Sequence, residues 1–152
     1  MDQARDVLNE AIQANPEKLD YQILLAEVFL DEGRVEDART VIDNIADAER
    51  TVAVKARMGF MGIIAEGPAL AKLQEILTGD PGHVESLYYM AHHLIVDSCY
   101  EEGMDLFLSV MQRDRDYRDD GGRKALLAVF DILGSDNPLV TAYRRKMFAV
   151  MH

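Results

Sequence analysis

The sequence has a single cysteine, Cys99, no tryptophan and only four prolines among 152 residues. One cysteine excludes an intramolecular disulfide, a CxxC redox pair and a cysteine-rich zinc site. No apolar run reaches the ~18 residues that a membrane-spanning helix needs. The charged residues Asp2, Arg5 and Asp6 are unlike the start of a signal peptide. We therefore expect a cytoplasmic protein without a membrane partner.

Positive charge is also scarce, because 16 Lys and Arg stand against 27 Asp and Glu, for a net charge of -11. The acidic excess is concentrated in residues 1–50, which hold 13 acids and 5 bases. Such a surface repels a polyanion, so we expect no nucleic-acid partner. The excess serves either solubility or the selection of a partner, and the sequence leaves both open.

Motifs for catalysis and metal binding are missing as well. There is no phosphate-binding glycine loop, no serine nucleophile elbow and no HExxH sequence. His93 and Asp97 have the spacing of a metal pair on a helix, but no third ligand accompanies them. The charged run 113–122 fails as a calcium loop, because Arg118 and Leu127 stand at two of the ligand positions. We therefore expect no enzyme activity, no cofactor and no metal.

Helical periodicity covers nearly the whole chain and is interrupted only at short Gly- and Pro-containing breaks. We predict an all-α fold of about nine helices, with neighbours antiparallel because the loops are short. Their ranges are 2–14, 18–32, 35–46, 50–65, 68–78, 83–98, 100–113, 120–133 and 138–150.

Residues at the predicted helix ends favour these boundaries. Pro68 suits a first helical position, where its missing N–H costs nothing. Asn137 and Pro138 have the order of an N-cap followed by a first helical residue. In the charged turn before residue 121, Asp119 or Asp120 is expected to cap the next helix.

Small residues recur at a nearly constant interval. Ala4, Ala38, Ala69 and Gly103 are separated by 34, 31 and 34 residues, with large apolar residues at fixed distances after each. The pattern resembles the tetratricopeptide (TPR) repeat of about 34 residues. In that repeat a small residue lets the second helix cross closely over the first. We therefore predict a TPR-like right-handed superhelix.

The repeat pattern predicts that residues 1–152 form a single TPR-like domain. Its expected parts are a half repeat (1–17), repeats near 18–49, 50–82 and 83–117, and a C-terminal capping helix pair (118–152). The half repeat makes the first helix unpaired. We therefore expect either a natural protein that continues N-terminally or an excised fragment.

TPR arrays bind ligands mostly with the inner face of the first helix of each repeat. The candidate binding residues on this face are Asp20, Ile23, Glu27, Met58, Met61, Glu85, Tyr88 and His92. Their carboxylates and adaptable Met and Tyr side chains favour a partner with basic segments, although Met and Tyr are also common core residues. Asp20 and Glu27 would repel the acidic C-terminal tails of Hsp70 and Hsp90, which other TPR domains bind.

The C-terminal third carries a more specific resemblance. Its residues are Arg113-Asp114-Arg115, Gly122-Arg123-Lys124-Ala125-Leu126-Leu127, Val129-Phe130, Leu133-Gly134, Asn137-Pro138-Leu139-Val140 and Tyr143-Arg144-Arg145-Lys146. This stretch resembles the C-terminal signature of the co-chaperedoxins (YbbN-type proteins), bacterial fusions of a thioredoxin-like domain with a TPR-like region. The resemblance extends over essentially all of 1–152, and it implies that the thioredoxin-like domain of the family is absent from these residues.

The resemblance implies a holdase-type chaperone of the stress response. Such a protein binds unfolded clients and passes them to the chaperonin GroEL or the Hsp70 system. It also implies that Arg144, Arg145 and Lys146 dock to the chaperonin, whereas a plain basic helix end is the alternative. Two other functions stay open: an accessory domain of a thioredoxin-like redox protein, and a general TPR scaffold of an unrelated assembly.

Overall fold

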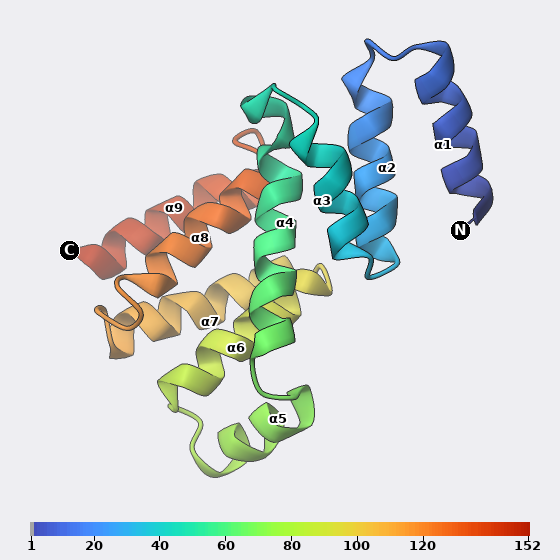
Figure 1. Cartoon of the computed structure of the whole chain (residues 1–152). Coiled ribbons are helices and arrows are strands. Elements are labelled where there is room, and N and C mark those ends of the chain that lie inside the picture. Colours follow the sequence, from blue (N-terminus) through green and yellow to red (C-terminus); the bar gives the residue numbers. More distant parts are fainter. Residues whose placement is uncertain (1) are drawn as a thin grey trace. The chain divides into compact units, whose positions relative to one another are not determined.

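The computed structural model describes residues 2–152, and within them it contains helices and no strand (Figure 1). The helices are α1 (Asp2–Ala14), α2 (Leu19–Asp31), α3 (Val35–Asp43), α4 (Ala48–Glu66), α5 (Leu70–Gly79), α6 (Val84–Val96), α7 (Tyr100–Arg113), α8 (Gly121–Leu133) and α9 (Pro138–Met151). The predicted all-α fold class is confirmed.

The chain forms two compact units, Met1–Met58 and Gly59–His152, and α4 runs from one into the other. In the first unit α1, α2 and α3 lie side by side and alternate in direction (Figure 1). In the second unit α6 and α7 form the most closely packed helix pair, and α8 and α9 pack on α7. The proposed division into a half repeat, three repeats and a capping pair stays a prediction.

Small residues allow the close approach of α2 and α3 in the first unit. Ala26 of α2 and Ala38 of α3 are both fully buried, with Leu25, Leu30 and Ile42 completing the contact. Ala38 is therefore the small, buried residue that the repeat spacing predicts.

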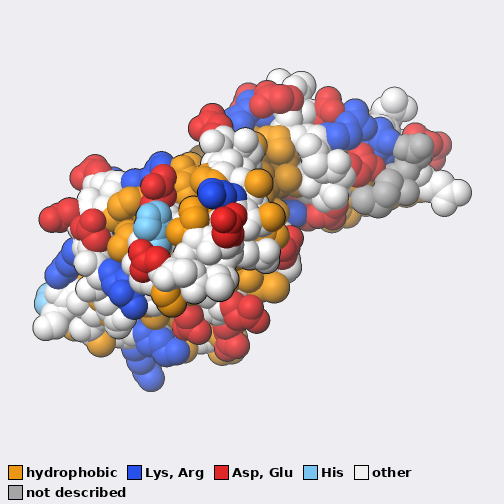
Figure 2. Space-filling view, turned by 90° about the horizontal axis from the view of Figure 1, so that it is seen from below, with side chains coloured by type: hydrophobic (Ala, Val, Ile, Leu, Met, Phe, Trp, Pro, Cys, Tyr) orange, Lys and Arg blue, Asp and Glu red, His pale blue; other side chains and the backbone are white. Residues whose placement is uncertain are grey.

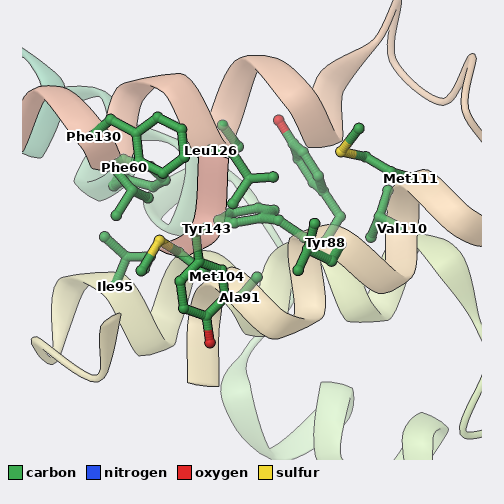
Figure 3. Close-up of a cluster of buried hydrophobic side chains, with 14 of the residues drawn as sticks. Phe60, Tyr88, Ala91, Ile95, Met104, Val110, Met111, Leu126, Phe130 and Tyr143 are labelled. Carbon is green, nitrogen blue, oxygen red and sulfur yellow. The ribbon is translucent and has the colours of Figure 1, made fainter. Parts of the chain in front are cut away.

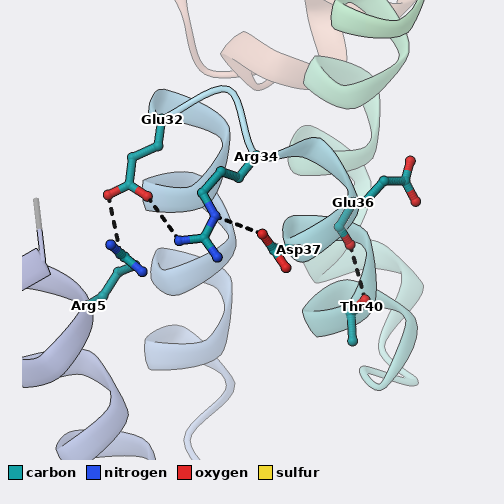
Figure 4. Close-up of polar contacts among 6 residues, drawn as sticks. All are labelled: Arg5, Glu32, Arg34, Glu36, Asp37 and Thr40. Atoms are coloured by element: carbon teal, nitrogen blue, oxygen red, sulfur yellow. Dashed lines mark hydrogen bonds and ion pairs between the residues drawn. The ribbon is translucent and has the colours of Figure 1, made fainter.

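An arginine at the α2–α3 turn links three helices of the first unit by ion pairs (Figure 4). The Arg34 guanidinium contacts the Asp37 carboxylate at 2.7 Å and the Glu32 carboxylate at 3.6 Å. Glu32 also pairs with Arg5 of α1 at 3.3 Å. The Arg34–Asp37 pair is exposed, and such pairs contribute little energy individually, whereas the Glu32 side chain is only 12% exposed.

The second unit has one continuous hydrophobic core between α6, α7, α8 and α9 (Figure 3). Met104, Phe107 and Val110 of α7 are fully buried in it, as are Leu126 of α8 and Val140 of α9. Phe60, from the second half of α4, also belongs to this core. The sequence period of α7 therefore places one face of the helix at the centre of the unit.

A buried tyrosine fixes α9 against α7. Tyr143 is 3% exposed, and its hydroxyl donates to the Asp105 carboxylate at 2.7 Å and to the Glu101 carbonyl at 3.3 Å. Burial and the adjacent Asp105 carboxylate raise the pKa of Tyr143. At the start of α9, the Asn137 side chain accepts a hydrogen bond from the Leu139 N–H, which confirms the predicted cap.

Two expectations at helix ends are wrong, and a third is right about the position of the residue but not about its hydrogen bond. Pro68 is not a first helical residue, because α5 begins at Leu70, and Ala69 is its exposed N-cap and not a buried crossing residue. The third helix ends at Asp43, where the Asn44 side chain donates to the Thr40 carbonyl. Asp120 stands at the N-cap of α8, but its side chain pairs with Arg123 and makes no capping bond.

Gly103 of α7 is expected to be intolerant of a side chain. A Cβ there would lie 2.6 Å from Ile95 Cδ1 and 3.2 Å from the Ala91 carbonyl oxygen of α6. Gly103→Ala should therefore lower the free energy of unfolding by about 1–2 kcal/mol through overpacking. Gly62 of α4 has nothing within 4 Å of an added Cβ. Gly62→Ala should therefore raise the free energy of unfolding by about 0.5–1 kcal/mol. Urea denaturation of both variants measures this difference in sign, and equal effects would contradict the close crossing.

Candidate protein-binding surfaces

The carboxylates on the face of α2 that carries Asp20 and Glu27 are largely paired within the first unit. Asp20 forms an ion pair with Arg50 of α4, and Asp31 pairs with Arg57 of α4 at 3.0 Å. Glu27 is half-buried and forms no ion pair within residues 2–152. The net negative charge that this face offers to a partner is therefore smaller than the sequence indicates. Ile23, beside these residues, is half-buried.

The other candidate residues differ in exposure. Met58 is 5% exposed and Met61 is half-buried. In the second unit Glu85 is exposed, whereas Tyr88 at 8% and His92 at 3% lie in the core. The structure thus places Tyr88 and His92 as core side chains, the alternative that the sequence left open for Tyr. Their part in binding stays a prediction.

His92 is enclosed by three aromatic rings. Its ring centroid lies 4.9 Å from that of Phe60, 4.4 Å from that of Tyr88 and 5.1 Å from that of Phe107. Its Nδ1 is 2.8 Å from the Tyr88 carbonyl oxygen. Burial lowers the pKa of His92 to about 4, although the Tyr88 hydrogen bond acts in the opposite direction. At neutral pH the ring is therefore uncharged and suited to packing.

The three bases predicted for chaperonin docking do not form one patch. The Arg144 guanidinium lies 5.5 Å from the Phe130 ring centroid, and Lys146 Nζ lies 4.4 Å from the Tyr143 ring centroid. Arg145 is exposed. Because consecutive helical residues point about 100° apart, each base faces a different direction.

An exposed phenylalanine lies on the same helix and is not among the binding residues expected from the sequence. Phe148 is 64% exposed, and its only aromatic neighbour among the described residues is His152, at 4.4 Å between ring centroids. The apolar stripe Leu139, Tyr143, Met147 and Val150 faces the core. Phe148 lies outside that stripe, and its exposure could have been predicted from this position.

No group of three His, Cys, Asp or Glu among residues 3–152 is placed to hold a metal ion. His93 and Asp97 share the end of α6 without a third ligand. Cys99 is a half-buried free thiol at the N-cap of α7, 3.8 Å from the Asp97 carbonyl oxygen. Among the described helices, none combines the length and apolar character needed to cross a membrane.

Charges of both signs are interspersed on the surface that Figure 2 shows, and hydrophobic side chains emerge between them. The largest exposed fractions among the hydrophobic side chains of the first unit are those of Val7 at 64%, Leu24 at 48% and Val52 at 41%. These apolar groups lie on a protein whose net charge is -11. Single exposed apolar side chains of this kind are normal on a protein surface and do not by themselves mark a binding site.

Comparison with known proteins agrees with this architecture. A family model described as tetratricopeptide repeat matches residues 63–152, and a second model of the same description matches residues 1–57. A search of curated proteins finds no match. TPR repeats are protein-interaction modules, and their all-α fold is typical of scaffolds without catalysis. Because the first model alone covers more than half of the 152 residues, the chain belongs to the tetratricopeptide repeat family.

Proposed function

We propose that this chain is the interaction module of a chaperone-like protein of the co-chaperedoxin type in the bacterial cytoplasm. In this role it holds unfolded client proteins and docks to the chaperonin through α9. The proposal is supported by the resemblance of residues 113–147 to the C-terminal signature of that family. The observation that carries it is Phe148, which is 64% exposed at the end of the last helix.

The α9 end has the composition of a binding hot spot. An exposed aromatic ring is an anchor for an apolar pocket, and Arg145 lies one turn before Phe148 on the same helix. Both side chains are exposed, and the bulk of α9 is fixed by Tyr143 and Val140 in the core. A rigid helix that presents Phe and Arg fits a partner with an apolar pocket and an acidic rim.

In this proposal, clients bind through the scattered apolar side chains of the first unit. Val7, Leu24 and Val52 are exposed among charged residues. Each gives a weak apolar contact, while the surrounding charge keeps the chain soluble. Weak contacts of this kind suit the reversible holding of many clients.

Phe148→Ala and Arg145→Glu are expected to weaken chaperonin binding by about tenfold or more each, as truncation of a hot spot does. Leu127→Ala is the apolar control, because Leu127 is 38% exposed on α8, and Arg39→Glu is the charge control on α3. Binding is measured by surface plasmon resonance on purified GroEL. These point variants are better than deletion of residues 137–152, which would remove the buried Val140 and Tyr143.

Unchanged GroEL affinity in both Phe148→Ala and Arg145→Glu would contradict docking through α9. The holdase part is tested separately, by light scattering of heat-denatured citrate synthase with and without the protein. A holdase slows the aggregation at stoichiometric amounts. If aggregation is unaffected, the chain is a TPR scaffold without chaperone activity.

A further inference from the structure

The turn between α7 and α8 has an unusual backbone. Arg118, Asp119 and Asp120 all have positive φ, at 51°, 55° and 66°. Residues other than glycine rarely adopt this conformation, and three in succession are destabilising. Such strain persists where the surrounding contacts determine it, and it is frequent at binding sites. In this turn the backbone conformation places the side chain of Arg118.

Arg118 is fixed against three tyrosine rings. Its Nη2 donates to the Tyr89 hydroxyl at 2.6 Å and its Nε donates to the Tyr117 hydroxyl at 3.2 Å. The guanidinium carbon lies 5.2 Å from the ring centroids of both Tyr88 and Tyr89, and 5.8 Å from that of Tyr117. These are cation–π distances. The tyrosines therefore orient the guanidinium without neutralising it.

The neighbouring carboxylates are paired with other bases. Asp119 contacts Lys124 at 3.1 Å, and Asp120 contacts Arg123 at 2.5 Å. Glu85 acts electrostatically on Tyr117, yet no ion pair joins any carboxylate of residues 3–152 to Arg118. Because a guanidinium has five N–H donors, two hydrogen bonds leave three donors for a ligand. Arg118 is thus an exposed, oriented and uncompensated cation.

We propose that Arg118, on its platform of Tyr88, Tyr89 and Tyr117, recognises a carboxylate of an acidic segment in a partner protein. The planar guanidinium matches a carboxylate in a two-bond geometry, and Tyr and Arg are the residues most enriched in hot spots. The site uses none of the residues proposed for chaperonin docking, so it stands independently of that function. Inorganic phosphate is the alternative anion, and the test below includes it.

The test is a titration of the ¹⁵N-labelled full chain with the peptide acetyl-Leu-Glu-Glu-Leu-amide, followed at the backbone N–H resonances of the turn and, in chains that keep Arg118, at its Nε–H resonance. We expect saturable shifts, and binding weaker by about tenfold or more for acetyl-Leu-Gln-Gln-Leu-amide, which lacks the carboxylates. Arg118→Gln should lose about tenfold in affinity, and Arg118→Lys nearly as much, because Lys keeps the charge without the planar fork. Arg39→Gln, on α3, removes the same charge elsewhere and should bind like the original chain.

A second variant keeps the test decisive if substitution of Arg118 disturbs the strained turn. Tyr89→Phe keeps the ring and removes only the hydroxyl that accepts from Arg118. It should bind the Glu peptide several-fold more weakly, with an unchanged circular dichroism spectrum. The proposal is overturned if the two peptides bind alike, if Arg118→Gln and Tyr89→Phe both keep full affinity, or if inorganic phosphate shifts the resonances of the turn and the Glu peptide does not.

Discussion

Replacing Phe107 by alanine is expected to lower the free energy of unfolding of the second unit by about 3–5 kcal/mol. Phe107 is fully buried, and its ring centroid lies 6.2 Å from that of Phe60, 6.0 Å from that of Tyr88 and 5.1 Å from that of His92. Truncation would remove all three ring contacts and leave a cavity between rigid helices. Because domains have a total stability of about 5–15 kcal/mol, this loss is a large fraction of it. Urea denaturation followed by circular dichroism measures this loss in the free energy of unfolding.

Phe148→Ala is the matched control, since it deletes the same atoms from a side chain that is 64% exposed. Its effect on stability should stay within about 0.5 kcal/mol. The contrast separates loss of core packing from loss of a phenyl group as such. Similar effects of the two substitutions would show that Phe107 does not occupy the centre of the core.

Helix number and type followed from the sequence because the period of apolar residues and the Gly- and Pro-containing breaks agree. Small residues at repeat spacing predicted buried positions at Ala38 and Gly103. The same spacing failed at Ala4, which is exposed, and at Ala69, which lies outside the helix as an N-cap. A repeat interval identifies equivalent positions only if the helix begins at the equivalent residue. The Gly67-Pro68 pair moves the start of α5 to Leu70, and the spacing between small residues does not reveal this shift.

The candidate binding face was less predictable than the fold. The helical period of α6 groups Tyr88 with His92, but it does not specify which helix covers them. Phe60 of α4 packs on His92 in the structure, and only the tertiary arrangement brings the two together. Likewise, the pairing of Asp20 with Arg50 depends on the approach of two helices and not on local spacing.

The turn at Arg118 shows a second limit. Its sequence, rich in Asp and Arg, indicates a solvated turn in which Asp119 or Asp120 caps the next helix. Asp119 and Asp120 instead form ion pairs, with Lys124 and Arg123. Arg118 does not, because positive φ values turn the backbone so that its side chain meets tyrosines of α6. Backbone conformation of this kind has no signature in a sequence that lacks glycine at those positions.

Acidification is expected to destabilise the second unit through His92. In the unfolded chain the His pKa is 6.5, and in the fold it is lowered to about 4, first because the ring is buried. Arg118 and His93 lower it further by charge repulsion. A lowered folded pKa means that the unfolded state binds the proton more tightly. Stability is therefore complete above pH 6.5 and is lost as the pH falls toward 4, by about 3 kcal/mol in total at 1.36 kcal/mol per pKa unit.

The measurement is the free energy of unfolding in urea at several pH values between 6.5 and 4.5, where most carboxylates still remain charged. His92→Phe provides the reference, since a phenyl ring fits among Phe60, Tyr88 and Phe107 and does not titrate. The original chain should lose stability more steeply than this variant, with a difference that approaches one bound proton per molecule. Parallel curves for the two proteins would show that His92 is protonated as readily in the fold as in the unfolded chain. That result would require the ring to be solvated and the aromatic enclosure to be open.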